Sequence, residues 1–391
     1  MSEVTHSMPT GALRLTVDQA RFPLDALIGF AARANAKRGF LFLSKVLGKH
    51  WPVTPRAMHA IHVDLAAQVP ADLPGPLIFI AMAETAIGLG QGVFEAYLRA
   101  HPGREALFLH SSRYRVGSLP FFEFEEAHSH APRQFLHLSP QAGELFARAR
   151  GLVLVDDEAS TGNTFVNLAF VCRARNPLLE RIHLAVITNF MGAAANAGLT
   201  RRFGLPTTVG AALSGHYSFT AVAAPAPAPE LAAAPAQRFE ADAERGASAA
   251  FGRIGIERAL AAPRQLAAQL ARQIGDDETV LVLGTGEFMH PSFLLARELE
   301  ALGKRVLVQS TTRSPILAWG AVGHILRCPD NYGEGVANYL YNVAPGQYRH
   351  VFICHETPVN AALVHLAGQL DGRLFHFQSE TTIEEIPVRR P

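Results

Sequence analysis

The sequence predicts an α/β fold with a mainly parallel sheet, followed by a second, smaller α/β (Rossmann-like) domain. Two observations lead to this prediction. Short apolar runs of strand length alternate with helical patterns along the chain, and this alternation stops at an Ala/Pro-rich stretch and then resumes. Buried strands that alternate with helices are typical of parallel sheets covered on both faces.

Length and composition fit two folded domains. The chain has 391 residues, of which 49% are hydrophobic and 18% charged. This length exceeds one ordinary compact domain, and the apolar content is sufficient for buried cores. The formal net charge of +1 gives no electrostatic reason to expect binding to nucleic acid or to an acidic membrane surface.

Cysteine use and the apolar runs favour a cytoplasmic protein. The three cysteines Cys172, Cys328 and Cys354 are widely spaced, which predicts neither a disulfide framework nor a zinc site. Residues 1–10 contain no apolar run, so no signal peptide is expected. The longest apolar runs have the length of strands, far below the roughly 20 residues of a membrane span.

A linker is expected where the composition changes. Residues 221–237 read AVAAPAPAPELAAAPAQ. Repeated proline prevents a helix or a central strand, because proline lacks an N–H and restricts the residue before it. We therefore predict a first domain at 20–220, a semi-extended linker at 221–240 and a second domain at 250–391.

The elements expected before the linker alternate in type. Apolar runs predict strands, and patterns with helical spacing predict the helices that follow them. The expected strands are 40–43, 77–81, 106–110, 152–155 and 182–188, and the expected helices are 90–100, 138–148 and 164–174.

The same alternation is expected after the linker. A helix at 263–274 tolerates its proline in the first turn. The further expected strands are 279–283, 305–309 and 351–355, and the further expected helices are 291–302 and 360–370.

The segment after the apolar run 152–155 has the features of a phosphate and ribose site. Two carboxylates follow the run, then a short loop of small residues leads to the next helix. Ligands of parallel α/β sheets bind beyond the carboxyl ends of strands, and helix N-termini bind phosphate through backbone N–H groups. Carboxylates accept hydrogen bonds from ribose hydroxyls. The residues concerned are Asp156, Asp157, Ala159, Ser160, Thr161, Gly162, Asn163 and Thr164. The alternative is an Asp-rich turn that ends one ordinary strand and caps one ordinary helix.

This order of residues resembles the signature of type I phosphoribosyltransferases. The resemblance implies that the segment binds phosphoribosyl pyrophosphate (PRPP). It also implies Mg²⁺ held mainly by the substrate, with Asp156 and Asp157 as candidate protein ligands. Ser160 stands where purine-salvage members often have an aspartate, which moves the likeness toward the orotate-type branch.

Two further segments resemble parts of the same family. Residues 77–92 resemble its pyrophosphate-binding loop, with Glu84 and Thr85 as the polar members; the alternative is a plain turn between a strand and a helix. Arg113 and Arg115 follow the next strand and could reach phosphate oxygens.

The polar segment 124–133 occupies the interval of the family's mobile catalytic loop. The resemblance makes His128, His130 and Arg133 the candidate catalytic residues, in contact with the leaving pyrophosphate. Orotate-type enzymes usually have a lysine in this loop, and this segment has none. A His-x-His metal site and a solvated loop without a role are the alternatives.

Basic residues also flank the apolar run 40–43, among them Lys37, Arg38 and Lys49. They could bind the acceptor substrate or a phosphate group. They could equally belong to a solvated strand end.

In the second domain, polar clusters follow the predicted strands and are expected to meet at one edge of the sheet. The candidate ligand-binding residues are Gly284, Thr285, Gly286, Glu287, Thr312, Arg313, Ser314 and Asp330. Hydroxyls and an arginine at a strand end suggest an anion site. A structural or oligomerising module is the alternative.

The run Thr312-Arg313-Ser314-Pro315 behind such a first domain resembles one bacterial family. Its members are orotate-phosphoribosyltransferase-like proteins with a C-terminal TRSP domain, associated with tellurium-resistance and stress-response gene clusters. The resemblance implies transfer of phosphoribosyl from PRPP to a nitrogenous, base-like acceptor, and a small-molecule biosynthetic role. Homodimers are common among type I relatives.

Two other functions remain open from the sequence. One is a non-catalytic sensor that binds PRPP and controls a partner, although no helix-turn-helix or basic patch is evident. The other makes the C-terminal domain the catalyst and the first domain its substrate feeder.

Overall fold

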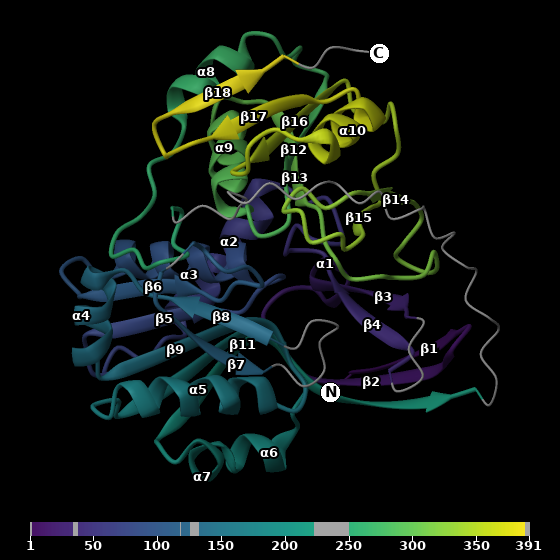
Figure 1. The fold of residues 1–391 in the computed structure, drawn as a ribbon. Coiled ribbons are helices and arrows are strands. Elements are labelled where there is room, and N and C mark those ends of the chain that lie inside the picture. Colours follow the sequence, from purple (N-terminus) through teal and green to yellow (C-terminus); the bar gives the residue numbers. More distant parts are fainter. Residues whose placement is uncertain (1, 34–37, 118, 126–132, 223–249, 388–391) are drawn as a thin grey trace. The chain divides into compact units, whose positions relative to one another are not determined.

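The structure, a computed structural model, describes residues 2–33, 38–117, 119–125, 133–222 and 250–387 (Figure 1). The chain divides into two compact units. Unit 1 contains the described residues within Met1–Ala57, His216–Gly246 and Ala262–Pro391, and unit 2 those within Met58–Gly215 and Ala247–Ala261. The predicted domain and linker boundaries stay a prediction, and most of the predicted linker lies outside the described residues.

Unit 2 consists of strands and helices in alternation. Its elements, in chain order, are α2 (Pro55–Ala67), β5 (Leu77–Ala81), α3 (Ile87–Ala100), β6 (Ala106–His110), β7 (Phe121–Glu125), β8 (Arg133–His137), α4 (Pro140–Arg148), β9 (Gly151–Ala159), α5 (Asn163–Arg175), β10 (Arg181–Asn189), α6 (Ala193–Ala197), α7 (Leu199–Phe203) and β11 (Thr207–Ala221).

The sheet of unit 2 is parallel and has the order β11-β10-β9-β5-β6. The predicted α/β fold with a mainly parallel sheet is therefore confirmed. The order places β5 beside β9 although β6 follows β5 in the chain. The strands β7 and β8 form a separate antiparallel pair.

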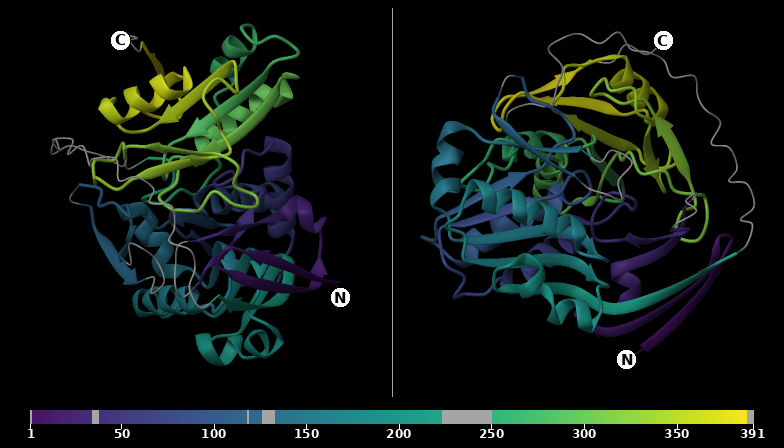
Figure 2. Two further views of the ribbon diagram at one scale, coloured as in Figure 1. Left: turned by 90° about the vertical axis from the view of Figure 1, so that its right-hand side faces the viewer. Right: turned by 60° about the horizontal axis from the view of Figure 1, so that its bottom comes forward.

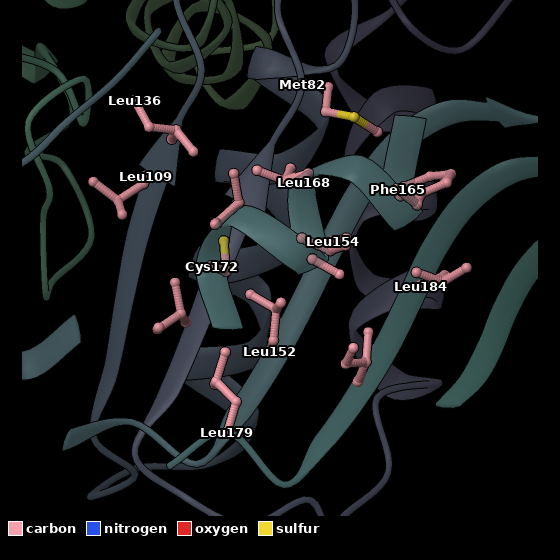
Figure 3. Packing of buried hydrophobic residues seen from close by; sticks show 14 of the residues in the cluster. Met82, Leu109, Leu136, Leu152, Leu154, Phe165, Leu168, Cys172, Leu179 and Leu184 are labelled. Atoms are coloured by element: carbon pink, nitrogen blue, oxygen red, sulfur yellow. The ribbon is translucent and has the colours of Figure 1, made fainter. Parts of the chain in front are cut away.

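Helices cover both faces of this sheet because its strands are apolar on both faces. On one face Leu152 and Leu154 of β9 pack with Phe165, Leu168 and Cys172 of α5 (Figure 3). On the other face lies α3, which contacts β5, β6 and β9. Its aromatic side chains meet those of the strands in the pairs Phe79–Phe94, Phe79–Tyr97 and Phe94–Phe108.

Most predicted elements of unit 2 exist, and several of them begin or end at other residues than predicted. The helix predicted at 90–100 begins earlier, at Ile87, since the three residues before Gly90 are also buried. The helix predicted at 138–148 begins at Pro140, where the Ser139 side chain accepts from the Ala142 N–H. The strand predicted at 152–155 continues to Ala159, because β10 pairs with it over that length.

Unit 1 contains the terminal segments of the chain. Its elements, in chain order, are β1 (Ser2–Met8), β2 (Gly11–Ala20), α1 (Leu24–Leu27), β3 (Ile28–Ala32), β4 (Phe40–Ser44), α8 (Arg264–Ala271), β12 (Thr279–Gly284), α9 (His290–Ala301), β13 (Arg305–Ser310), β14 (Ile325–Cys328), β15 (Asn338–Tyr341), β16 (His350–His355), α10 (Ala361–Leu370), β17 (Arg373–Phe377) and β18 (Ile383–Ile386).

The main sheet of unit 1 has the order β13-β12-β16-β17-β18 and is parallel except for β18 (Figure 1). Figure 2 shows its C-terminal strands, in yellow, from two further sides. Helix α9 packs on β12 and β13 and contacts α8. The apolar side chains of α10 instead pack with Leu281, Leu283 and Ile353. The predicted second α/β region is therefore confirmed. Among the described residues, no helix combines the length and apolar character needed to span a membrane.

Candidate functional site: the carboxyl edge of the unit 2 sheet

The order of the unit 2 sheet creates a topological switch point between β5 and β9. The helix after β5, α3, lies on one face of the sheet, and the helix after β9, α5, lies on the other. The loops at the carboxyl ends of these two neighbouring strands therefore diverge. Ligands of open α/β sheets bind outside the strand ends at such a point. Both sequence segments that were predicted to bind PRPP begin here.

The acidic residues lie on the strand β9 itself. Val155 is the last residue of β9 that pairs with β5, while pairing with β10 continues to Ala159. Asp156 and Asp157 thus lie beyond the end of β5, and both are half-buried. The Asp157 N–H donates to Asp156 Oδ1 at 2.9 Å, and Thr188 Oγ1 donates to the Asp157 carbonyl at 3.3 Å. These bonds fix the carboxyl end of β9.

The loop Ser160–Gly162 turns the chain from β9 into α5. Gly162 has φ 73° and occupies the N-cap position of α5, a conformation that glycine adopts without strain. The first turn of α5 therefore starts directly behind a residue without a side chain. The N–H groups in the first turn of a helix have no intrahelical partner, and together with the helix dipole they favour an anion there. Thr161 and Asn163 are exposed, and Thr164 is half-buried.

The second loop, Met82–Ala86, links β5 to α3 and contains a cis peptide bond between Ala83 and Glu84. Two buried side chains hold Ala83 in place. The Ala83 N–H donates to Ser111 Oγ at 2.8 Å, and Gln134 Nε2 donates to the Ala83 carbonyl at 2.9 Å. Ser111 Oγ also donates to Gln134 Oε1 at 2.8 Å, so the two clamping side chains fix each other.

A hydrogen bond joins the second loop to the carboxyl end of β9. Thr85 Oγ1 donates to Asp157 Oδ1 at 3.1 Å. Glu84 beside it is buried. The structure thus brings together Glu84, Thr85, Asp156 and Asp157, which lie in two segments far apart in the sequence.

The two arginines predicted to reach phosphate lie in different surroundings. Arg113 Nη2 approaches the Ala83 carbonyl at 3.4 Å, so Arg113 lies at the second loop. Arg115 forms an ion pair with Glu123 at 3.2 Å and stacks on the Phe121 ring at 4.8 Å. The described contacts of Arg115 are therefore with the β7–β8 pair.

The three predicted catalytic residues lie at the margin of what is described. His128 and His130 are outside the described residues. Arg133 is the first residue of β8, opposite Glu125 in the register, and its side chain is not described. Their catalytic role stays a prediction.

Sequence reasoning missed four residues at this edge. Ser111 and Gln134 shape the second loop, Thr188 supports β9, and Arg202 reaches the first loop from α7. Arg202 Nη2 donates to Asn163 Oδ1 at 2.9 Å. No local pattern marks these residues, because each acts on a segment that is distant in the sequence.

In unit 1 a buried lysine connects two of the predicted ligand-binding segments. Lys49 Nζ donates to the Gly286 carbonyl at 2.6 Å, to Ser310 Oγ at 3.0 Å and to the Thr311 carbonyl at 3.1 Å. The Gly286 N–H in turn donates to Thr311 Oγ1 at 2.9 Å. Lys49 has no exposed surface, so the solvated strand end considered for it from the sequence is wrong.

The arginine of the Thr312–Ser314 run is balanced by carboxylates. Arg313 forms ion pairs with Asp330 at 3.3 Å and with Glu334 at 3.2 Å. Ser314 Oγ accepts from Arg33 Nη2 at 3.1 Å, and Thr312 is buried. The two carboxylates reduce the positive charge that Arg313 could offer to an anion.

The other candidate ligand-binding residues of unit 1 are buried in its interior. Thr285 and Glu287 are buried, and the Tyr332 hydroxyl donates to Glu356 Oε1 at 2.8 Å and approaches the Thr285 carbonyl at 3.2 Å. Gly284 ends β12 in close contact with the backbone of Phe288. Whether these residues bind a ligand stays a prediction.

Two regions of the chain match known protein families. Residues 27–216 match the family described as phosphoribosyl transferase, and residues 250–370 match the TRSP domain described as C-terminal to it. No curated protein matches the chain.

Solved structures similar to this chain include three phosphoribosyltransferases. The adenine enzyme from Trypanosoma brucei is 14% identical, with a TM-score of 0.36 over 54% of this chain and 87% of its own. The adenine enzyme from Giardia lamblia is 16% identical, with a TM-score of 0.32 over 49% and 98%. The orotate enzyme from Francisella tularensis is 12% identical, with a TM-score of 0.28 over 44% and 72%.

Proposed function

We propose that the chain is a phosphoribosyltransferase that uses PRPP as donor, because residues 27–216 match the phosphoribosyl transferase family. The phosphoribosyl group goes to a nitrogen of a base-like acceptor, and pyrophosphate is released. The observation that carries the proposal is the Thr85–Asp157 hydrogen bond, which joins the loop after β5 to the carboxyl end of β9 at the switch point. A donor with a phosphate at each end needs two phosphate-binding loops flanking a ribose site.

Each part of the edge then has a role. The loop Ser160–Gly162 and the first turn of α5 bind the 5′-phosphate through N–H groups and the Thr161 and Thr164 hydroxyls. Asp156 and Asp157 accept hydrogen bonds from the ribose hydroxyls. Backbone amides of Met82–Ala86, with Arg113 beside them, bind the pyrophosphate.

Carboxylate oxygens at the end of β9 suit Mg²⁺, a hard cation that keeps few protein ligands. Within the described ranges, no group of three or more His, Cys, Asp and Glu side chains could hold a metal. Asp156 and Asp157 would therefore contribute ligands to an ion bound mainly by the substrate. Bound Mg²⁺ would neutralise the charge of the leaving pyrophosphate.

In the transfer, the bond between the anomeric carbon and the pyrophosphate oxygen breaks, and a bond from that carbon to the acceptor nitrogen forms. The electron pair leaves with pyrophosphate, and the acceptor nitrogen loses its proton. The ribose passes through a state with positive charge, which half-buried carboxylates at the end of β9 favour. The clamp of Ser111 and Gln134 fixes one loop before the substrate arrives, which avoids ordering it during the reaction.

Calorimetric titration with PRPP, with and without Mg²⁺, tests the proposal. The variant Asp156→Asn/Asp157→Asn should lose Mg²⁺-dependent binding. The control Asp72→Asn/Glu105→Gln removes two acids at the other edge of the sheet. Asp72 pairs with Arg181, the first residue of β10, and Glu105 directly precedes β6. This control should bind PRPP as the wild type does.

Two outcomes would change the conclusion. If the folded wild type does not bind PRPP, the proposed donor is wrong. If it binds PRPP but releases no pyrophosphate with any nitrogenous acceptor, a sensor that only binds PRPP becomes the better explanation. Tellurium resistance, a stress-related pathway and a homodimer rest on the family resemblance, a cytoplasmic location rests on cysteine use and the apolar runs, and all four stay predictions.

A further inference from the structure

Arg202 lies beside the first loop of the site, although it comes from a separate short helix. A Cβ atom added to Gly162 would lie 3.3 Å from Arg202 Nη1, and Arg202 Nη2 donates to Asn163 Oδ1 at 2.9 Å. The guanidinium therefore covers both the N-cap residue and the first residue of α5. Arg202 is half-buried, whereas its neighbour Arg201 is exposed.

The position of Arg202 is fixed by the packing of α7. Leu199 and Phe203, one at each end of α7, are buried in the core that α5 and the sheet share. Arg173 of α5 donates to the Phe203 carbonyl at 2.7 Å. The backbone around Arg202 is thus anchored on two sides, and its side chain extends from a rigid base toward the loop.

The charge of Arg202 does not suit its place unless an anion binds there. The N-terminus of α5 carries the positive end of the helix dipole, where a cation is unfavourable and an anion is favourable. Its hydrogen-bond partner at the loop is the neutral amide oxygen of Asn163, and a guanidinium has five N–H donors. In the part of the chain that the structure describes, no carboxylate forms an ion pair with Arg202. An anion at the loop would neutralise the charge of Arg202 and accept hydrogen bonds from its remaining N–H donors.

We propose that Arg202 is a substrate-binding residue that donates to the 5′-phosphate of PRPP at the Gly162 loop. The inference rests on the proposed function, and it assigns a residue to one end of the substrate. The planar guanidinium can bind two phosphate oxygens at once, and Asn163 holds it in the orientation for this. Pyrophosphate, which binds at the other loop, should not depend on Arg202.

The test uses the full chain and three ligands: PRPP with Mg²⁺, ribose 5-phosphate, and pyrophosphate with Mg²⁺. The variants are Arg202→Ala, Arg202→Lys, Asn163→Ala and the matched control Arg201→Ala. Circular dichroism and thermal unfolding establish that each variant is folded. Calorimetry then gives the dissociation constant of every pair of variant and ligand.

Arg202→Ala should weaken PRPP and ribose 5-phosphate by about ten- to a hundredfold, the loss of a charge-assisted contact, and leave pyrophosphate unchanged. Arg202→Lys should recover part of the affinity, because it restores the charge without the planar fork. Asn163→Ala should cause a smaller loss, and Arg201→Ala should behave as the wild type.

Three outcomes would overturn the inference, and they are separable from one another. Wild-type affinity of Arg202→Ala for ribose 5-phosphate would show that Arg202 does not contact the phosphate, while the proposed function stands. An equal loss for pyrophosphate and ribose 5-phosphate would mean that Arg202 only supports the fold of the site. A wild type that binds no PRPP would remove the proposed function and this inference together.

Discussion

Replacing Gly162 by alanine should weaken PRPP binding and leave the protein folded. Gly162 has φ 73°, which an L-residue adopts at a cost of about 1–2 kcal/mol. The added Cβ would lie 2.9 Å from Met191 Sδ, and a flexible methionine can move at small further cost. We therefore expect the free energy of unfolding of unit 2 to fall by about 1–2 kcal/mol.

The affinity for PRPP should fall because the new methyl group also lies 3.3 Å from Arg202 Nη1, on the side of the loop where the phosphate is proposed to bind. Loss of even one charge-assisted hydrogen bond, about 2 kcal/mol, weakens binding roughly thirtyfold.

The matched control is Gly103→Ala. Gly103 has φ 88°, and nothing lies within 4 Å of its added Cβ. It lies in the turn before β6, at the edge opposite to the site, so it should show similar strain and unchanged binding. Urea unfolding gives the stabilities and calorimetry gives the affinities. If folded Gly162→Ala binds PRPP within about twofold of the wild type, the loop does not contact the phosphate and the reasoning fails.

Two further predictions concern stability. Lys49→Met removes three hydrogen bonds to buried acceptors of unit 1 and should lower its free energy of unfolding by about 2–5 kcal/mol in urea titrations. Lys304→Met, which removes an ion pair with the exposed Asp276 and a hydrogen bond to the Ile274 carbonyl, should lower the free energy of unfolding less, and equal losses would contradict this account. Burial lowers the pKa of His183 to about 4, below its ordinary 6.5. The unfolded chain then binds the proton first, so the stability that His183 contributes is complete above about pH 6.5 and declines toward pH 4, by about 3 kcal/mol in total. His183→Gln should flatten this decline, whereas the exposed His216→Gln should not; an unchanged slope in His183→Gln would exclude His183 as its source.

The sequence alone was enough for the local elements and the first loop of the site. Strands such as Leu77–Ala81 and Ala106–His110 have the predicted bounds, because an apolar run between turns is a local property of the chain. The strand, the acidic pair and Gly162 are likewise contiguous. Their order could therefore be read without knowing how the chain folds.

The N-terminal hairpin of β1 and β2, the strand β3 that pairs with the predicted β4, and the pair β14–β15 were not predicted. Their strands are short or of mixed polarity, and pairing with a partner strand stabilises them. Propensity within one segment does not encode such pairing.

Only the tertiary structure decided which residues, far apart in the sequence, lie together at each candidate site. Arg202 acts on Asn163 39 residues away, and Lys49 acts on Gly286 237 residues away. From the sequence, ligand binding and a solvated strand end were both open for Lys49, and no pattern pointed to Arg202. Periodicity along a chain reports which face of an element is buried, whereas the partner on that face depends on the order of strands in the sheet. In unit 2 that order, with β5 beside β9, is what brings the two loops of the site together.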